Sequence, residues 1–168
     1  SFERPLTGVI SVRSDGPIKS LDQLRGKTVA INDRLVLNSI LTLKELEKRG
    51  IGLRDLVIVP AASQNSALLS VAAGDVDAAI TVNFAIGQIP PERQGELRIL
   101  FQTEEVPSMP STLILVHPAM AARDRQRLEA SLMSFAATGA GKRFLLASQY
   151  KNVVRAVPKD VRKLDIYL

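Results

Sequence analysis

The sequence predicts an α/β protein whose sheet is covered by helices on both faces. Short apolar, strand-like runs alternate with amphipathic, helix-like stretches from residue 6 to residue 101. Polar and glycine-containing turns separate these stretches. The hydrophobic fraction of 46% over 168 residues is enough for a packed core. This strand–helix–strand order is typical of sheets covered by helices on both sides.

The first two strands are expected in residues 6–13 and 27–31. The first is an alternating, β-branched run, and a turn at Asp15-Gly16-Pro17 ends it. A short helical turn capped by Ser20 then leads to the second strand. Residues 36–50 follow as an amphipathic helix. Gly50 is expected to end it, and its inward face is predicted to consist of Ile40, Leu43 and Leu46.

The next unit repeats the pattern of strand, helix and strand. The run LVIVPA at residues 56–61 is continuously apolar, which is typical of a central, buried strand. Residues 76–83 are expected to form another buried strand. The helix between them should turn four side chains inward: Ala67, Leu68, Val71 and Ala72.

The last third is less regular. After a short helix or loop, a strand is expected in residues 97–101, and Pro107 and Pro110 then interrupt the chain. Residues 111–117 (STLILVH) are expected to form a strand. A long helix is predicted in residues 121–141, with helix and loop from Phe144 onward.

Composition excludes several classes of function. The chain has no Cys, so disulfides, thiolate metal sites and Cys catalysis are excluded, and one His rules out multi-His metal sites. Aromatic residues make up 4% and Trp is absent, which disfavours stacking on nucleic acid. The net charge of +5 favours anionic partners, yet most basic residues stand among acidic ones, as on solvated helices. We therefore expect a binding protein without metal, cofactor or nucleic-acid partner.

Three features of the sequence could suggest a functional site, but we interpret each of them as structural. The stretch ATGAGKRF lacks the Gly and the Ser or Thr of a phosphate-binding loop, at Ala136 and Arg143. Asp75 and Asp77 are interpreted as a turn and a strand start. The sequence shows no obvious Ser or Asp with which His117 would form a catalytic pair, so a catalytic role is not expected.

Two loops are the candidate binding sites, because each ends a strand and opens a helix. Ligands of open α/β sheets lie beyond the carboxyl ends of strands, and a helix N-terminus offers free N–H groups to a phosphate, phosphonate, sulfate or carboxylate. The alternative is that the polar residues merely cap the helices. The candidate ligand-binding residues are Asp33, Arg34, Asn38, Ser39, Ser63, Gln64, Asn65, Ser66 and Asn83.

The order of motifs resembles a known family. Residues 8–33 hold a Leu-x-x-Leu-x-Gly-Lys-x-Val-Ala pattern, and residues 50–80 combine a polar loop, an alanine-rich helix and a Gly-x-x-Asp-Ala-Ala strand start. Residues 97–120 are similar to a return through a hinge. Together these stretches resemble the phosphate/phosphite/phosphonate-binding proteins, the PhnD-like periplasmic components of ABC transporters. The resemblance implies a type II periplasmic-binding fold, with a mixed sheet and helices on both faces.

Two positions depart from the family pattern. Val36-Leu37-Asn38-Ser39 stands where the family usually has a Ser-Thr-Ser-Gly anion loop. Gln64 stands where the family tends to have His. The sequence therefore leaves open whether the ligand is a phosphonate, a different anion or a different polar solute. A sensing role without tight binding also remains open.

The resemblance also implies a domain assignment. Residues 8–107 correspond to the second lobe, and residues 108–168 to the return through the hinge and the C-terminal helical part of the first lobe. The family has roughly a hundred residues ahead of this start, so we expect a fragment or a self-associating chain, through apolar surface left by the missing part.

The leading functional hypothesis is a solute-binding module for a small anion in an ABC uptake system, with a membrane permease as partner and a periplasmic location. The alternative is a periplasmic or extracellular, membrane-anchored sensory domain of a receptor or signalling enzyme. The effector domain of a transcriptional regulator and a small-metabolite enzyme of the same fold are further alternatives.

Overall fold

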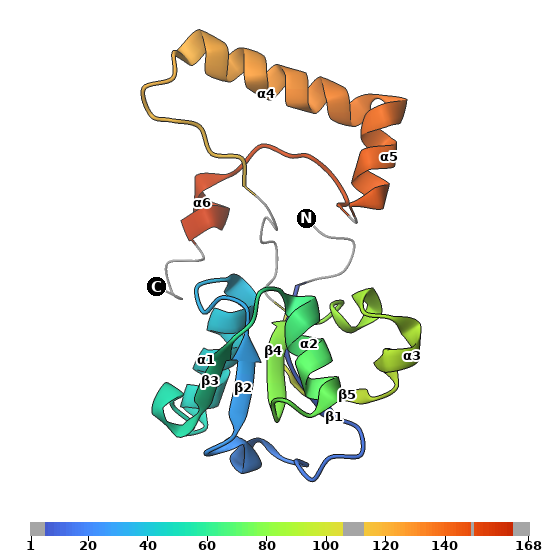
Figure 1. Cartoon of the computed structure of the whole chain (residues 1–168). Coiled ribbons are helices and arrows are strands. Elements are labelled where there is room, and N and C mark those ends of the chain that lie inside the picture. The colour runs from blue at the N-terminus through green and yellow to red at the C-terminus, as the bar shows by residue number, and fades with distance from the viewer. Residues whose placement is uncertain (1–5, 106–112, 149, 163–168) are drawn as a thin grey trace. The chain divides into compact units, whose positions relative to one another are not determined.

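The computed structural model describes residues 6–105, 113–148 and 150–162 (Figure 1). The chain divides into two compact units. The first unit is Leu6–Glu105, and the second unit comprises Ser1–Pro5 and Val106–Leu168. The assignment of residues 8–107 and 108–168 to two lobes stays a prediction.

A five-stranded mixed sheet forms the centre of the first unit. Its strands stand in the order β3-β2-β4-β1-β5. β2 runs parallel to both of its neighbours, whereas β1 runs antiparallel to both of its own. The predicted mixed α/β sheet is therefore confirmed. The strands are β1 (Gly8–Arg13), β2 (Thr28–Ile31), β3 (Val57–Pro60), β4 (Ala78–Val82) and β5 (Leu97–Gln102).

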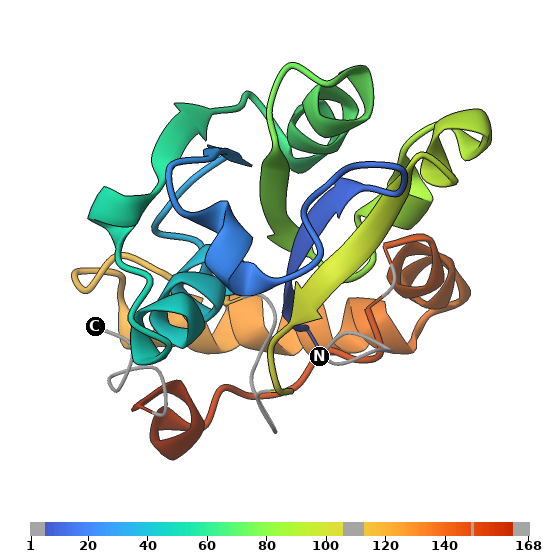
Figure 2. The same cartoon turned by 90° about the horizontal axis from the view of Figure 1, so that it is seen from below.

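Helices cover both faces of this sheet, as the alternation of side chains along β2 shows. Val29 and Ile31 point to one apolar cluster, which includes Leu46 of α1 (Leu37–Lys48). Ala30 points to a second cluster, which includes Leu68 of α2 (Gln64–Ala73). Figure 2 shows α1 and α2 on opposite sides of the strands. The short helical elements of the unit are η1 (Leu21–Leu24), η2 (Leu53–Asp55), η3 (Ile86–Gln88) and α3 (Pro91–Gln94).

The inward face of α2 agrees with the sequence pattern, but that of α1 does so only in part. All four expected side chains of α2 are buried. In α1, Leu46 is buried and Leu43 packs partly buried against the core, but Ile40 remains partly exposed. The reason is Gly8 of β1, where a Cβ would lie 2.2 Å from Thr42 Oγ1 and 2.5 Å from the Asn38 carbonyl oxygen. This close approach turns the Asn38–Thr42 side of the helix toward the sheet.

The prediction that residues 56–61 form a central strand is wrong. β3 lies at the edge of the sheet, and Val57 remains 51% exposed. None of the four residues of β3 is buried, so a continuous apolar run predicts a strand but not its place in the sheet. The buried central strand is β4, whose five residues are all buried.

The second unit contains α4 (Ala122–Ala137), α5 (Gly139–Ala147) and α6 (Pro158–Val161). The long helix expected in residues 121–141 is therefore confirmed for residues 122–137, but its expected end is wrong. Thr138 adopts extended backbone angles between α4 and α5, and its Oγ1 accepts a hydrogen bond from the Gly141 N–H at 3.0 Å. Gly141 packs so closely on α4 that a Cβ there would lie 1.9 Å from the Phe135 carbonyl oxygen. This small residue allows the chain to turn sharply into α5.

The strand expected in residues 111–117 is also wrong for the part that is described. Residues 113–117 belong to no strand, and the described residues of the second unit contain no strand element. A β-branched run needs a neighbouring strand for its hydrogen bonds, and no such neighbour is present among them. Residues 111 and 112, like Pro107 and Pro110, lie outside the described residues.

Candidate functional site

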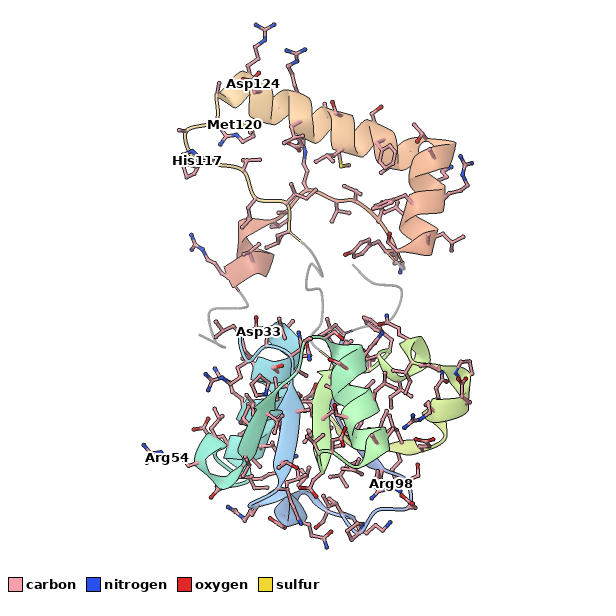
Figure 3. All side chains as sticks on the ribbon, viewed as in Figure 1. Asp33, Arg54, Arg98, His117, Met120 and Asp124 are labelled. Carbon is pink, nitrogen blue, oxygen red and sulfur yellow. The ribbon has the colours of Figure 1, made fainter. Side chains whose placement is uncertain are left out.

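The candidate residues meet at one edge of the sheet, here called the carboxyl edge, where β2, β3 and β4 end. These three strands are parallel, so the loops that follow them lie at the same edge. β1 begins there and β5 ends there, since the Asn83 N–H donates to the Thr7 carbonyl and the Thr103 N–H to the Gly8 carbonyl. Figure 3 shows Asp33 at this edge, with Arg54 and Arg98 away from it.

The start of α2 is closed by its own side chains. The Ser63 Oγ accepts a hydrogen bond from the Ser66 N–H at 3.1 Å, and the Ser66 Oγ accepts one from the Ser63 N–H at 2.9 Å. The Ser66 hydroxyl also donates to the Ser63 carbonyl at 2.9 Å. This is a capping box, in which both hydroxyls satisfy the helix end. The two serines therefore act as caps in this structure.

The other two candidates of α2 differ in their bonding. The Gln64 Oε1 accepts a hydrogen bond from the Val82 N–H at the end of β4, at 2.8 Å. The Asn65 side chain makes no hydrogen bond to any of the described residues and is partly exposed. Gln64 thus anchors the helix to the sheet, while Asn65 stays available.

The start of α1 lacks a cap. Its N-cap residue is Val36, which has no side chain able to accept a hydrogen bond, and the first turn contains no acidic residue. The backbone N–H groups of Leu37, Asn38 and Ser39 have no acceptor among the described residues. The Asn38 Nδ2 and the Ser39 Oγ are buried and also lack partners there. These five groups are here called the α1 terminus.

Both helices begin with an Asn-Ser pair at their second and third residues, which makes the difference between them informative. In α2, Ser66 bonds to Ser63, whereas in α1, Ser39 has no corresponding partner because Val36 takes the place of the cap. Buried polar groups are nearly always hydrogen-bonded, so unpaired donors indicate a missing acceptor. The α1 terminus thus collects donors that an anion would satisfy.

The loop before α1 carries one charge of each sign. The Asp33 Oδ1 accepts a hydrogen bond from the Leu35 N–H at 2.8 Å, which fixes the turn into the helix. Arg34 is exposed and forms no ion pair with the described residues. Arg34 is therefore free to contact a ligand, whereas one carboxylate oxygen of Asp33 is hydrogen-bonded within the turn.

Asn83 at the end of β4 bonds to the start of β1. Its Oδ1 accepts from the Thr7 N–H at 3.4 Å, and its own N–H donates to the Thr7 carbonyl at 3.1 Å. The structure adds Thr7 and Asn32, whose Oγ1 and Oδ1 are buried without a partner among the described residues. Sequence reasoning missed both, although each is a polar residue next to a strand end at the same edge.

The net positive charge of the chain lies in the second unit, whereas the candidate residues lie in the first unit. The first unit holds 11 of the 22 Lys and Arg and 12 of the 17 Asp and Glu, a net charge of −1. The remaining 11 basic and 5 acidic residues give the second unit +6. The expectation that the overall charge helps to capture an anion therefore gains no support from the unit that contains the α1 terminus.

Other kinds of site receive little support from the described residues. They contain no group of three or more His, Asp or Glu side chains that could hold a metal ion. None of their helices is long and apolar enough to cross a membrane. His117 lies in the turn before α4 (Figure 3), where its Nδ1 accepts from the Ala119 N–H at 3.2 Å.

A comparison with protein families gives one match over nearly the whole chain. Residues 3–161 match the family described as the phosphonate periplasmic substrate-binding protein of ABC transporters. No curated protein matches the sequence.

Solved structures show the same fold at low sequence identity. A Xanthomonas citri protein solved with bound ATP is 22% identical, with a TM-score of 0.77. The binding-protein component of an ABC phosphonate transporter from Pseudomonas aeruginosa is 13% identical, with a TM-score of 0.80. PhnD1 from Prochlorococcus marinus, solved with methylphosphonate, is 13% identical, with a TM-score of 0.74. The predicted type II periplasmic-binding fold is thereby confirmed.

The likeness covers this chain almost completely but those proteins only in part. It includes 99%, 97% and 97% of this chain, and 66%, 56% and 65% of the three proteins. The chain therefore spans between 56% and 66% of the length of these proteins.

Proposed function

The chain belongs to the family of phosphonate periplasmic substrate-binding proteins of ABC transporters, and from this premise we propose that it binds a small oxyanion at the α1 terminus. A phosphonate is the first ligand to test, because the family description names it. Delivery to a membrane permease and a periplasmic location are parts of the same proposal. The ligand contacts expected of the other candidate residues stay predictions: Asp33, Ser63, Gln64, Asn65, Ser66 and Asn83.

The observation that carries the proposal is the contrast between the two helix ends. At α2 the side chains of Ser63 and Ser66 each bond to the backbone of the other residue. The Gln64 Oε1 accepts a hydrogen bond from the Val82 N–H. At α1 the backbone and side-chain donors of Asn38 and Ser39 have no partners among the described residues. An oxyanion supplies several acceptor oxygens at once, so it matches a cluster of unpaired donors.

Two further effects favour an anion there. The aligned peptide dipoles of α1 place a partial positive charge at its first turn, which stabilises a nearby anion by about 0.3–1 kcal/mol or more when partly buried. No acidic side chain in that turn opposes it. Arg34, exposed in the preceding loop, can add a full positive charge. The proposed mechanism is thus anion capture by backbone donors, completed by Asn38, Ser39 and Arg34.

Titration calorimetry and thermal unfolding test this proposal, with methylphosphonate, phosphite, phosphate, sulfate and acetate as probes. Binding to the folded state raises the melting temperature by mass action. The matched variants are Asn38→Ala and Asn65→Ala, which remove the same side chain from the second residue of α1 and of α2. We expect Asn38→Ala to weaken binding about tenfold, as for the loss of one hydrogen bond to a charged group. Asn65→Ala should bind like the wild type.

The outcomes separate the alternatives. Binding that is lost with Asn65→Ala and kept with Asn38→Ala would assign the anion to α2 and contradict the proposed location. The absence of heat and of a thermal shift with every probe, in a folded wild-type chain, would contradict anion binding by this chain. Circular dichroism of both variants controls for folding.

A further inference from the structure

A threonine one turn into α1 holds the uncapped end of that helix. The Thr42 hydroxyl donates a hydrogen bond to the Asn38 carbonyl oxygen at 2.7 Å. Side chains of a helix point toward its N-terminus, so Thr42 lies on the same side of α1 as Asn38 and reaches back to it. Thr42 is fully buried. Its hydroxyl therefore fixes the residue whose amide nitrogen has no partner among the described residues.

The sheet supports this contact from the other side. α1 packs on β1, and a Cβ at Gly8 would lie 2.2 Å from the Thr42 Oγ1 and 2.5 Å from the Asn38 carbonyl oxygen. Gly8 is itself held by Thr103, which directly follows β5. The Gly8 N–H donates to the Thr103 Oγ1 at 3.0 Å, and the Gly8 carbonyl accepts from the Thr103 N–H at 2.9 Å. The start of α1 thus rests on a firmly bonded part of the sheet.

A bond of the same kind occurs one position later in α2, where it serves a different purpose. The Ser70 hydroxyl donates to the Ser66 carbonyl oxygen at 2.9 Å. Ser66 already belongs to the capping box with Ser63, so the start of α2 is also fixed by its cap. α1 has no such cap, because its N-cap residue is Val36. In α1 the bond from Thr42 is therefore the side-chain restraint on the first turn.

We propose that Thr42 is a positioning residue for the oxyanion, an inference that rests on the proposed function. Thr42 does not contact the anion itself. A capping side chain restrains a helix start by occupying one of its N–H groups, which would remove a donor from the site. Thr42 instead bonds to the Asn38 carbonyl and leaves the N–H groups open. Donors that are fixed in advance lose less conformational freedom on binding, which raises the affinity.

Two substitutions separate the hydroxyl of Thr42 from its methyl group. Thr42→Val keeps the branched shape and removes the hydroxyl, whereas Thr42→Ser keeps the hydroxyl and removes the methyl group. The probe is the tightest binder among methylphosphonate, phosphite, phosphate, sulfate and acetate, and titration calorimetry measures its affinity. We expect Thr42→Val to weaken binding about three- to tenfold, on the scale of one hydrogen bond, and Thr42→Ser to bind within about twofold of the wild type.

The melting temperature should follow the methyl group instead. Thr42→Ser leaves a small cavity in a buried place, so its melting temperature should fall more than that of Thr42→Val. A merely structural role for Thr42 would lower the affinity and the melting temperature together. Affinity that follows the melting temperature across the two variants would therefore overturn the proposal.

Hydrogen exchange without any anion measures the positioning directly. The Ile40 N–H donates to the Val36 carbonyl at 3.0 Å in the first turn of α1. Its exchange should be at least about threefold faster in Thr42→Val than in Thr42→Ser, because the first turn opens locally more often without the hydroxyl. Equal exchange rates of the Ile40 N–H in the two variants would contradict the proposed restraint.

Ser70→Ala is the matched control, because it removes the corresponding bond from α2 and should leave the affinity unchanged. A wild type that binds none of the probes overturns the proposed function, and this inference with it. A wild type that binds, with unchanged affinity in Thr42→Val, overturns this inference alone. An equal loss of affinity in Thr42→Val and Ser70→Ala does so as well.

Discussion

The side-chain carbonyl oxygen of Gln64 accepts a hydrogen bond from the backbone N–H of Val82 at 2.8 Å. Gln64 is the first residue of α2 and Val82 the last of β4, so this bond fastens the start of the helix to the carboxyl edge of the sheet. Val82 is 4% exposed, which leaves its N–H little access to water. Only the amide nitrogen of Gln64 remains to donate to a ligand.

Replacing Gln64 with Ala should destabilise the protein by about 1–3 kcal/mol, since a buried N–H would lose its acceptor. Asn65→Ala removes an amide without a hydrogen bond among the described residues and should change stability by less than about 0.5 kcal/mol. Urea unfolding of both variants measures the difference. Equal stability of the two variants would show that the bond from Val82 contributes nothing.

Replacing Ser63 with Ala should cost about 0.5–2 kcal/mol, because the Ser66 N–H would lose its cap. Ser63→Asp keeps an acceptor at the same position and should restore most of the stability. Neither change should alter the affinity for an oxyanion at the α1 terminus. Chemical unfolding and titration calorimetry test the two parts separately, and a large loss of affinity in Ser63→Asp would instead favour a ligand contact at α2.

Gly8→Ala should be strongly destabilising, by at least about 1–3 kcal/mol. The new Cβ would lie 2.5 Å from the Asn38 carbonyl oxygen, which is backbone and cannot rotate away, so α1 must move from β1. Gly87→Ala is the control, because a Cβ there meets nothing within 4 Å. Thermal unfolding monitored by circular dichroism should show a clear fall in melting temperature for Gly8→Ala alone.

Gly141→Ala should disrupt the corner between α4 and α5, since its Cβ would lie 1.9 Å from the Phe135 carbonyl oxygen. Gly139→Ala, two residues earlier, meets only the end of the Arg143 side chain, at 3.7 Å, and should be tolerated. Hydrogen exchange at the first amides of α5 measures the effect. Similar exchange rates in both variants would show that the tight packing is not needed for the turn.

Asp77 should contribute a pH-dependent part of the stability. Partial burial alone raises the pKa of Asp77, but hydrogen bonds from the Thr28 N–H and hydroxyl, at 2.9 and 2.8 Å, and the charge of Lys27 outweigh it, so the pKa is lowered. A lowered pKa in the folded state means that the stabilisation is complete above the unfolded pKa of about 3.9 and is lost as the pH falls through the folded value.

The Asp77→Asn variant tests this origin. Its free energy of unfolding should fall less steeply than that of the wild type below about pH 4, where the unfolded carboxylate takes up its proton. Asp75→Asn, two residues earlier in the chain and at an exposed position, serves as the control. Parallel acid profiles for the wild type and Asp77→Asn would contradict the assignment.

Local sequence patterns were enough to predict several elements of this protein. Alternation predicted β1, apolar periodicity predicted α2, and the small polar residues at positions 63–66 predicted a capped helix start, because these signals act between residues close in the chain. The carboxyl edge as the place of the candidate site also followed from the strand–helix order.

The places of those elements and the pairing of the polar groups could be read only from the folded structure. It placed β3 at the edge of the sheet, left residues 113–117 without a strand, and ended α4 before Thr138. It also showed that the Gln64 side chain is bonded to Val82, whereas the Asn38 Nδ2 and the Ser39 Oγ have no partner in the described part of the chain. Strand order and hydrogen-bond pairing depend on residues far apart in the chain, so no local pattern specifies them.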